Sequence, residues 1–231
     1  MAYSSSAAPV TINLATNGAS GGDASGDTIS GFEGVTGSPS TDVLLGTAGD
    51  NLIIGGGGGD IMVGGEGNDS LNYAASPAGV TIDLAAQTAS GGDATGDTIA
   101  GFASVFGTAG RDHLLGSSGR NTFRPGGRAD VVDGRAGIDT VDYSTSSAAV
   151  LVDLGAGSAS GGDASGDTLT ALENVTGSVF GDSLTGDVGD NALKGKAGND
   201  ALDGGLGIDA LDGGDGTDTC TNGETVTNCE G

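Results

Sequence analysis

The segment Gly55–Tyr73 reads GGGGGDIMVGGEGNDSLNY and decides the fold of the chain. Five consecutive glycines are typical of a flexible linker. Here, however, the run leads into Asp60 and the apolar triplet Ile61–Val63, and a second series of glycines, an acid and an apolar residue follows directly. This order favours a repeated structural device that needs glycine at fixed positions.

The device is a nonapeptide that occurs thirteen times, in three runs, with Asp or Asn at its sixth position and an apolar residue at its eighth. The sixth positions are Asp42, Asn51, Asp60, Asp69, Asp112, Asn121, Asp130, Asp139, Asp182, Asn191, Asp200, Asp209 and Asp218. The eighth positions are Leu44, Ile53, Met62, Leu71, Leu114, Phe123, Val132, Val141, Leu184, Leu193, Leu202, Leu211 and Cys220. A linker would not keep two chemical types in register over thirteen copies, so the linker interpretation fails.

A longer period contains these runs, and Tyr3, Tyr73 and Tyr143 open its three copies. The predicted modules are residues 3–72, 73–142 and 143–212, followed by a tail at 213–231 with the final repeat and a cystine hairpin. We expect the modules to stack as one continuous solenoid. We expect Met1–Ala2 to be a cloning scar on a piece cut from a longer protein at a repeat boundary, with a native start as the alternative.

The composition limits the possible functions. Against 31 acidic residues stand only 7 basic ones, a formal net charge of −24, so the chain cannot attract nucleic acid. With 49 glycines and 3% aromatic residues, it also lacks the side chains for a thick core. Such a chain is either disordered or neutralised by cations. No apolar run is long enough to predict a membrane span, and MAYSSSAAPV lacks the features of a signal peptide.

The nonapeptides GGEGNDSLN, GKAGNDALD and GGLGIDALD resemble the glycine-aspartate repeats of the RTX, or hemolysin-type, calcium-binding family. The resemblance covers roughly half of the chain. It implies an all-β, right-handed parallel β-roll or β-solenoid of stacked nonapeptide coils, with several bound Ca²⁺ ions. It also implies a secreted bacterial protein located outside the cell or at its surface.

Elementary geometry agrees with this resemblance. The glycine-rich first part of each repeat forms a turn and the last part a short strand, so two nonapeptides make one coil, and the strands of successive coils stack in parallel. Calcium prefers six to eight oxygen ligands, and residues two repeats apart lie one above the other. The predicted ions therefore lie between Asp42 and Asp60, Asn51 and Asp69, Asp182 and Asp200, Asp200 and Asp218, and Asn191 and Asp209. Because the core is thin, calcium is expected to supply much of the folding energy.

By the family resemblance, backbone carbonyls at the first and third positions of the repeat complete these sites. The residues concerned are Gly55, Gly57, Gly64, Glu66, Gly195, Ala197, Gly204, Leu206, Gly213 and Asp215.

The second module departs from the pattern, because it holds five of the seven basic residues and places Pro125 and Arg128 where the repeat has glycine. We expect fewer or weaker ions around Asp112, Asp130 and Asp139. In the alternative, the arginines only balance surface charge and leave the ions in place.

The segments between the runs contain alternating stretches such as Val10–Leu14, which predict a strand with Val10, Ile12 and Leu14 buried. Each segment is close in length to two coils, so we expect it to continue the solenoid. Each also repeats a pair of acids, which could bind further calcium or form Asx-turns, the turn being favoured. The pairs are Asp23 with Asp27, Asp93 with Asp97, and Asp163 with Asp167.

Cys220 and Cys229 flank the turn signal Asn222-Gly223. A short hairpin there would bring both sulfurs into bonding range and close a cap over the last coil. A disulfide implies an oxidising, extracellular compartment.

Catalytic signals are weak. Gly18–Gly22 formally fits the G-x-S-x-G pattern, but its copies lose the first glycine, and His113 lies inside a nonapeptide. We therefore expect no enzyme. The function classes that remain are a calcium-responsive folding module, a structural or adhesive stalk or self-assembling surface-layer or filament subunit, and an accessory domain of a secreted hydrolase or toxin. The expected partners are calcium, further copies of the chain or other domains of a longer parent.

Overall fold

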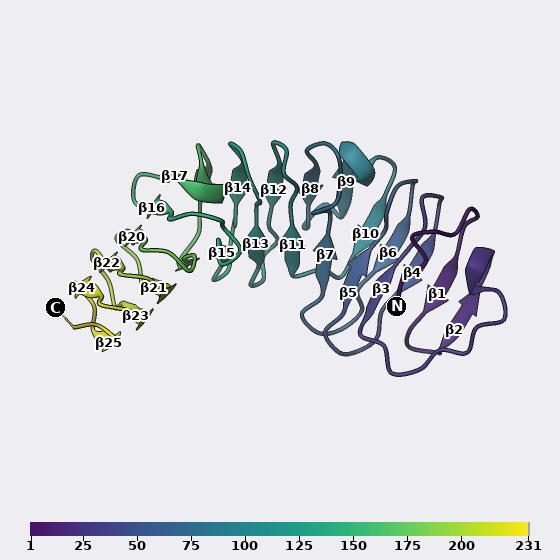
Figure 1. Cartoon of the computed structure of the whole chain (residues 1–231), viewed down its shortest axis with the longest axis horizontal. Coiled ribbons are helices and arrows are strands. Elements are labelled where there is room, and N and C mark those ends of the chain that lie inside the picture. Colours follow the sequence, from purple (N-terminus) through teal and green to yellow (C-terminus); the bar gives the residue numbers. More distant parts are fainter. Residues whose placement is uncertain (231) are drawn as a thin grey trace. The chain divides into compact units, whose positions relative to one another are not determined.

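The structure is a computed structural model that describes residues 1–230 and divides into two compact units, Met1–Leu115 and the part from Gly116 onward. Both units are built from short β-strands, as Figure 1 shows. The helices among residues 1–230 are three single 3-10 turns, η1 (Gly22–Ala24), η2 (Gly92–Ala94) and η3 (Gly162–Ala164). None has the length and hydrophobicity that crossing a bilayer would need. The all-β fold class is confirmed.

In the first unit the strands form two sheets. One has the order β2-β1-β4-β6-β10-β9-β8-β12 and the other β11-β7-β5-β3. The strands are β1 (Thr11–Asn13), β2 (Gly18–Ser20), β3 (Gly34–Thr36), β4 (Val43–Leu45), β5 (Leu52–Ile54), β6 (Ile61–Val63), β7 (Ser70–Asn72), β8 (Thr81–Asp83), β9 (Thr88–Ser90), β10 (Thr98–Ala100), β11 (Ser104–Phe106) and β12 (His113–Leu115).

The second unit repeats this arrangement with the orders β14-β18-β17-β16-β20-β22-β24 and β25-β23-β21-β19-β15-β13. Its strands are β13 (Thr122–Arg124), β14 (Val131–Asp133), β15 (Thr140–Asp142), β16 (Leu151–Asp153), β17 (Ser158–Ser160), β18 (Thr168–Thr170), β19 (Asn174–Thr176), β20 (Ser183–Thr185), β21 (Ala192–Ala197), β22 (Ala201–Asp203), β23 (Ala210–Asp215), β24 (Thr219–Thr221) and β25 (Thr225–Thr227). The division into three modules stays a prediction, since the boundary between the units falls inside the second one.

Each nonapeptide forms one strand at its end, and consecutive nonapeptides alternate between the two sheets. The parallel register joins residues two repeats apart, with Leu44 opposite Met62 and Leu193 opposite Leu211. Two nonapeptides therefore make one coil, as the spacing predicts. This register aligns the sixth positions of stacked coils in the same way.

The core is one side chain thick on each sheet. The eighth-position side chains from Leu44 to Leu211 are all at most 2% exposed. Cys220 is the exception, being only partly buried. The expectation for the first interleaved strand is also confirmed, because Val10, Ile12 and Leu14 are 1%, 0% and 6% exposed.

The interleaved segments continue both parallel sheets, as expected, with β10 parallel to β6 and β11 parallel to β7, but they do so by a path other than two coils of two-repeat length. In the first unit, β9 pairs antiparallel with both β8 and β10, and β10 in turn lies parallel to β6. The strands β16, β17 and β18 repeat this meander on β14. The chain thus advances along the sheet to β8 and then runs back to β6, which makes the offset from Met62 to its partner Ile99 larger than two repeats. The interleaved segments are thus close in length to two coils of nonapeptides, but their backbone follows a different path.

A tyrosine at the start of each module stabilises this meander. The Tyr143 hydroxyl donates a hydrogen bond to Asp167 Oδ2 at 2.7 Å, and Tyr73 and Tyr3 donate in the same way to Asp97 and Asp27. Tyr73 and Tyr143 are at most 3% exposed, and burial raises the pKa of both well above its ordinary value. Each phenol therefore stays neutral and serves as a donor.

The disulfide between Cys220 and Cys229 is present, with Cα atoms 5.9 Å apart. The predicted hairpin is wrong: β24 pairs with β22 in one sheet and β25 pairs with β23 in the other. The cystine therefore links β24 in one sheet to the segment that directly follows β25 in the other sheet, without a hairpin between these two strands.

Replacing Leu193, which is fully buried, by alanine is expected to lower the free energy of unfolding by about 2–5 kcal/mol, because it opens a cavity in a core one residue thick. Leu206→Ala is the matched control, since that side chain is 69% exposed. Urea denaturation in excess calcium measures both variants. Equal losses would contradict the assignment of the core.

Tyr143→Phe is expected to destabilise the folded chain by about 1.5–3 kcal/mol, because it removes a buried hydrogen bond to a carboxylate. The matched variant is Tyr3→Phe, whose partner Asp27 is exposed to solvent and which is expected to cost less. The same denaturation experiment compares them, and a larger effect at Tyr3 would refute the role given to the buried pair.

Candidate metal centre

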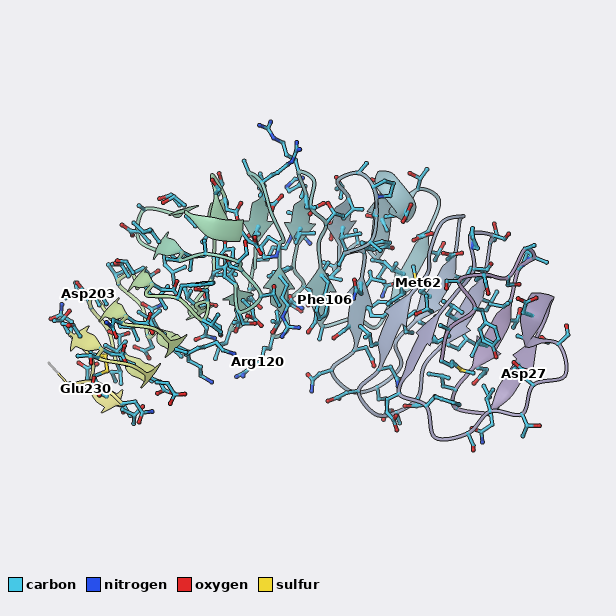
Figure 2. All side chains as sticks on the ribbon, viewed as in Figure 1. Asp27, Met62, Phe106, Arg120, Asp203 and Glu230 are labelled. Atoms are coloured by element: carbon cyan, nitrogen blue, oxygen red, sulfur yellow. A yellow bond between two sulfur atoms is a disulfide. The ribbon has the colours of Figure 1, made fainter. Side chains whose placement is uncertain are left out.

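The sixth-position side chains point into the turns instead of into water. All thirteen of these Asp and Asn residues, from Asp42 to Asp218, are at most 3% exposed. Acids are almost never this buried unless they are paired. Figure 2 labels four charged side chains outside this set, Asp27, Arg120, Asp203 and Glu230.

Stacked coils are joined through these acids. One carboxylate oxygen of each upper residue accepts the backbone N–H of the sixth-position residue one coil below. Asp60 Oδ1 accepts from Asp42 N at 2.8 Å, and Asp209 Oδ1 accepts from Asn191 N at 2.8 Å. The same contact joins Asp69 to Asn51, Asp139 to Asn121, Asp200 to Asp182, and Asp218 to Asp200. Every pair predicted from the stacking register is therefore adjacent, while its sharing of an ion stays a prediction.

Five further acids accept the backbone N–H of a sixth-position residue in the same way, although they lie outside the thirteen nonapeptides. Asp97 and Asp167 accept the N–H groups of Asp60 and Asp130, at 2.8 and 2.9 Å. Glu173, Glu224 and Glu230 accept those of Asp139, Asp209 and Asp218, each at 2.7 Å. The three glutamates were missed by sequence reasoning, because their separations from their partners, 34, 15 and 12 positions, do not match the stacking register.

The second oxygen of several acids has no hydrogen-bond partner, although it is buried. These atoms are Oδ2 of Asp60, Asp69, Asp139, Asp200, Asp209 and Asp218. Leaving a charged oxygen buried and unpaired costs several kcal/mol, so a proton or a cation must compensate it.

The pKa values respond to this burial. Desolvation raises the pKa of Asp60 to about 7, with the carboxylates of Asp97 and Asp42 adding to the effect. Desolvation likewise raises the pKa of Asp200 and Asp139 to about 6, and that of Asp69 above its ordinary value. Without a cation, the charged form of these acids is therefore disfavoured.

Glycine at the first position of the repeat makes room for oxygen atoms. A Cβ on Gly195 would overlap both Asp200 Oδ2 and the carbonyl oxygen of Gly213, one coil further along. At Gly204 the overlapping oxygens are Asp209 Oδ2 and Asn222 O. Two acceptors that converge in this way, with no donor assigned to the carboxylate oxygen, form a cradle for a cation.

The donor set fits calcium, which binds carboxylate and carbonyl oxygens. No three acidic, histidine or cysteine side chains come together as a metal cluster among residues 1–230, and backbone carbonyl oxygens lie beside the buried acids. The first-position carbonyls of Gly55, Gly64, Gly204 and Gly213 all point at the glycine one coil below. A bound Ca²⁺ would supply the positive charge that these buried oxygens need. The third-position carbonyls of Gly57, Glu66, Ala197, Leu206 and Asp215 stay predicted ligands.

The acid pairs between the runs behave differently from the repeats. The backbone N–H groups of Asp23, Asp93 and Asp163 donate to the hydroxyls of Ser6, Ser76 and Ser146 at 3.0–3.1 Å. The second acids, Asp27, Asp97 and Asp167, accept the tyrosine hydroxyls described above. Whether either member binds calcium stays a prediction.

In the second module, two of the arginines have partners outside the buried acids of the loops. Arg124 Nε donates to Asp142 Oδ2 at 2.7 Å, and Arg135 Nη1 donates to Gly116 O at 2.9 Å. In this contact the Arg124 side chain is partly exposed, whereas Asp142 is largely buried. The expectation of fewer or weaker ions at Asp112, Asp130 and Asp139 stays a prediction.

These features define a class: a parallel β-roll whose glycine-rich turns bury oxygen ligands for calcium. Comparison with family models agrees with it. The model for the RTX calcium-binding nonapeptide repeat matches residues 36–71, 106–141, 176–211 and 185–220, which together cover just over half of the chain. The chain belongs to this family, whose repeats bind several calcium ions. No curated protein matches it significantly.

Gly195→Ala is expected to lower the free energy of unfolding in calcium by about 1–3 kcal/mol, because the added methyl group meets Asp200 Oδ2 and Gly213 O. Gly127→Ala is the control, since nothing lies within 4 Å of its Cβ position. A calcium titration followed by circular dichroism measures the midpoint of folding for each. Unchanged folding of the Gly195 variant would argue against the cradle.

Proposed function

We propose that this chain is the calcium-responsive β-roll region of a secreted bacterial protein, disordered where calcium is scarce and folded in the calcium outside the cell. The observation that carries the proposal is the set of buried carboxylate oxygens without partners at six turns. In the absence of cations their burial opposes folding, and it adds to the self-repulsion of a net charge of −24.

Calcium drives the folding by mass action. An ion that binds only the folded state stabilises it by about 2.7 kcal/mol at a concentration 100 times its dissociation constant. Several such ions add their effects, so a modest rise in calcium concentration suffices to fold a chain with a thin core. The disulfide between Cys220 and Cys229 supports an oxidising destination, because such bonds persist outside the cytosol.

The calcium requirement is tested by circular dichroism of the whole chain with its disulfide intact. We expect β-sheet signal to appear on addition of millimolar CaCl₂ and to disappear on addition of excess EGTA, while MgCl₂ at the same concentration has little effect. A β-sheet spectrum that persists in EGTA would refute calcium-driven folding. Equal responses to both metals would refute selectivity for calcium.

One observation favours a second candidate, a self-assembling surface-layer or filament subunit, or an adhesive stalk. Val188, Leu206 and Ile208 are 78%, 69% and 71% exposed. They lie on adjacent turns of the second unit, because Leu206 N donates to Asp187 O and Ile208 N to Asp190 Oδ1. An exposed apolar group of this kind is typical of an association surface. Light scattering during the calcium titration distinguishes the candidates, since only assembly produces large particles.

The third candidate is an accessory domain of a secreted hydrolase or toxin. In that case the activity resides in another part of a longer parent protein, and this chain supplies calcium-dependent folding.

A further inference from the structure

The turns of the nonapeptides are of two kinds, which differ at the second residue. In the first kind, the backbone N–H of the second residue donates to the sixth-position side chain of the same turn. Ser178 N donates in this way to Asp182 Oδ2, and Asp187 N donates to Asn191 Oδ1 at 2.7 Å. The same bond closes the turns that begin at Gly37, Gly46, Gly107 and Gly116. We name these six turns closed.

In the second kind, the second residue has a positive φ, and its N–H leaves the sixth-position acid. The residues are Gly56, Gly65, Arg135, Lys196, Gly205 and Gly214, with φ between 68° and 118°. In two of these turns the N–H donates elsewhere: Arg135 N bonds to Asp133 Oδ1 at 2.9 Å, and Gly205 N bonds to Asp203 Oδ1 at 3.2 Å. We name these six turns open. The remaining turn shares the positive φ at Gly126, but it begins with Pro125 and is counted in neither group.

The unpartnered carboxylate oxygens lie in the open turns. Each of the six turns holds one of the buried Oδ2 atoms that lack a hydrogen-bond partner, from Asp60 to Asp218. In the closed turns, by contrast, the N–H of the second residue donates to a side-chain oxygen of the sixth residue. The acceptor is Oδ2 of Asp42, Asp112 and Asp182 and the single amide oxygen of Asn51, Asn121 and Asn191. The orientation of the peptide before the second residue therefore distinguishes the two kinds of turn. In a closed turn its N–H donates to the sixth residue, whereas in an open turn the sixth-position carboxylate keeps an oxygen without a donor.

In five of the open turns, a backbone carbonyl oxygen of the neighbouring coil and the carboxylate of the sixth residue both lie where a Cβ on the first-position glycine would be. The pairs are Asp69 with Gly101 O, Asp139 with Ala171 O, Asp200 with Gly213 O, Asp209 with Asn222 O, and Asp218 with Asn228 O. Carbonyl oxygens also approach closed turns, such as Gly55 O at Gly37, but the sixth-position oxygen there already has a donor. Asp60 lies in an open turn whose glycine has no carbonyl oxygen as close.

We infer that the peptide before the second residue decides which turns bind calcium, so that ions bind at the open turns of Asp69, Asp139, Asp200, Asp209 and Asp218 and not at the closed ones. The inference rests on the proposed calcium-dependent folding and deepens it. The closed turns begin each run of nonapeptides and hold their shape through hydrogen bonds, without a bound ion.

The side chain of the second residue explains the choice in most turns. The closed turns carry Ser38, Thr47, Thr108, Ser117, Ser178 or Asp187 there, and the Ser38 and Ser178 hydroxyls also donate to Asp42 and Asp182 at 2.8 Å. Four open turns carry glycine, which adopts positive φ without strain. Arg135 and Lys196 adopt it despite their side chains, which costs about 1–3 kcal/mol each.

A competing arrangement would share an ion equally between every pair of stacked acids, such as Asp182 and Asp200. The two acids make a matched pair for distinguishing the arrangements. Each is 3% exposed, and each accepts a backbone N–H of the neighbouring coil at 2.7 Å. They differ in that Asp182 lies in a closed turn and Asp200 in an open one.

The experiment compares Asp182→Asn and Asp200→Asn with the unmodified chain, by isothermal titration with CaCl₂ and by circular dichroism. Asparagine keeps one accepting oxygen. In Asp200→Asn the amide group replaces the unpartnered Oδ2, whereas in Asp182→Asn it removes the acceptor of either Ser178 N or Val150 N. Circular dichroism in calcium therefore first verifies that each variant folds, and the ion count is compared for the folded variants. We expect Asp200→Asn to bind one ion fewer and Asp182→Asn to bind the full number. Equal losses, or a loss confined to Asp182→Asn, would overturn the inference.

A second pair of variants changes the turn and leaves the acid in place. Lys196→Ser, which favours the closed turn, is expected to remove one ion, whereas Lys194→Ser, at an exposed position of the same strand, is expected to remove none. Loss of an ion from both, or from neither, would overturn the inference. Absence of calcium binding by the unmodified chain would instead refute the proposed function itself.

Discussion

The burial of carboxylates without an opposite charge is the constraint on which the structure depends. Thirteen inward-pointing Asp and Asn side chains are at most 3% exposed, and in six turns an acid has one oxygen that no donor reaches. Such burial is unfavourable in itself. The fold therefore carries, along its turns, an electrostatic cost that a bound cation can offset.

The rest of the architecture follows from this constraint. Each sheet contributes one inward residue per strand, so apolar burial alone is thin, and no large aromatic core compensates among residues 1–230. Hydrogen bonds from the N–H of one coil to the acid of the next hold the coils in register, as between Asp182 and Asp200. Glycine is needed at Gly195 and Gly204 because oxygen atoms occupy the space that a side chain would fill. Stability and cation binding are thus properties of the same atoms.

The sequence predicted the repeating part of the fold well, because a period of nine specifies both chemistry and spacing. Leu44 lies opposite Met62 and Leu193 opposite Leu211, as residues two repeats apart should. It failed where partners are separated by other distances. The meander of β8, β9 and β10, the pairing of Tyr143 with Asp167, and the crossing of the chain between β24 and β25 have no counterpart in the nonapeptide period. Glu224 was overlooked for the same reason, although it receives the N–H of Asp209.

The sequence by itself determined the repeat, the buried and turn positions, the coil of two repeats, the terminal cystine and the calcium-binding family, because all of these depend on residue type at fixed spacing. Only the tertiary structure decided which turns leave an acid without a donor. That property depends on the orientation of one peptide, which places its N–H at the side chain of the sixth residue in the closed turns and away from it in the open ones. Arg135 and Lys196 adopt positive φ as the glycines do, so residue type alone does not reveal it.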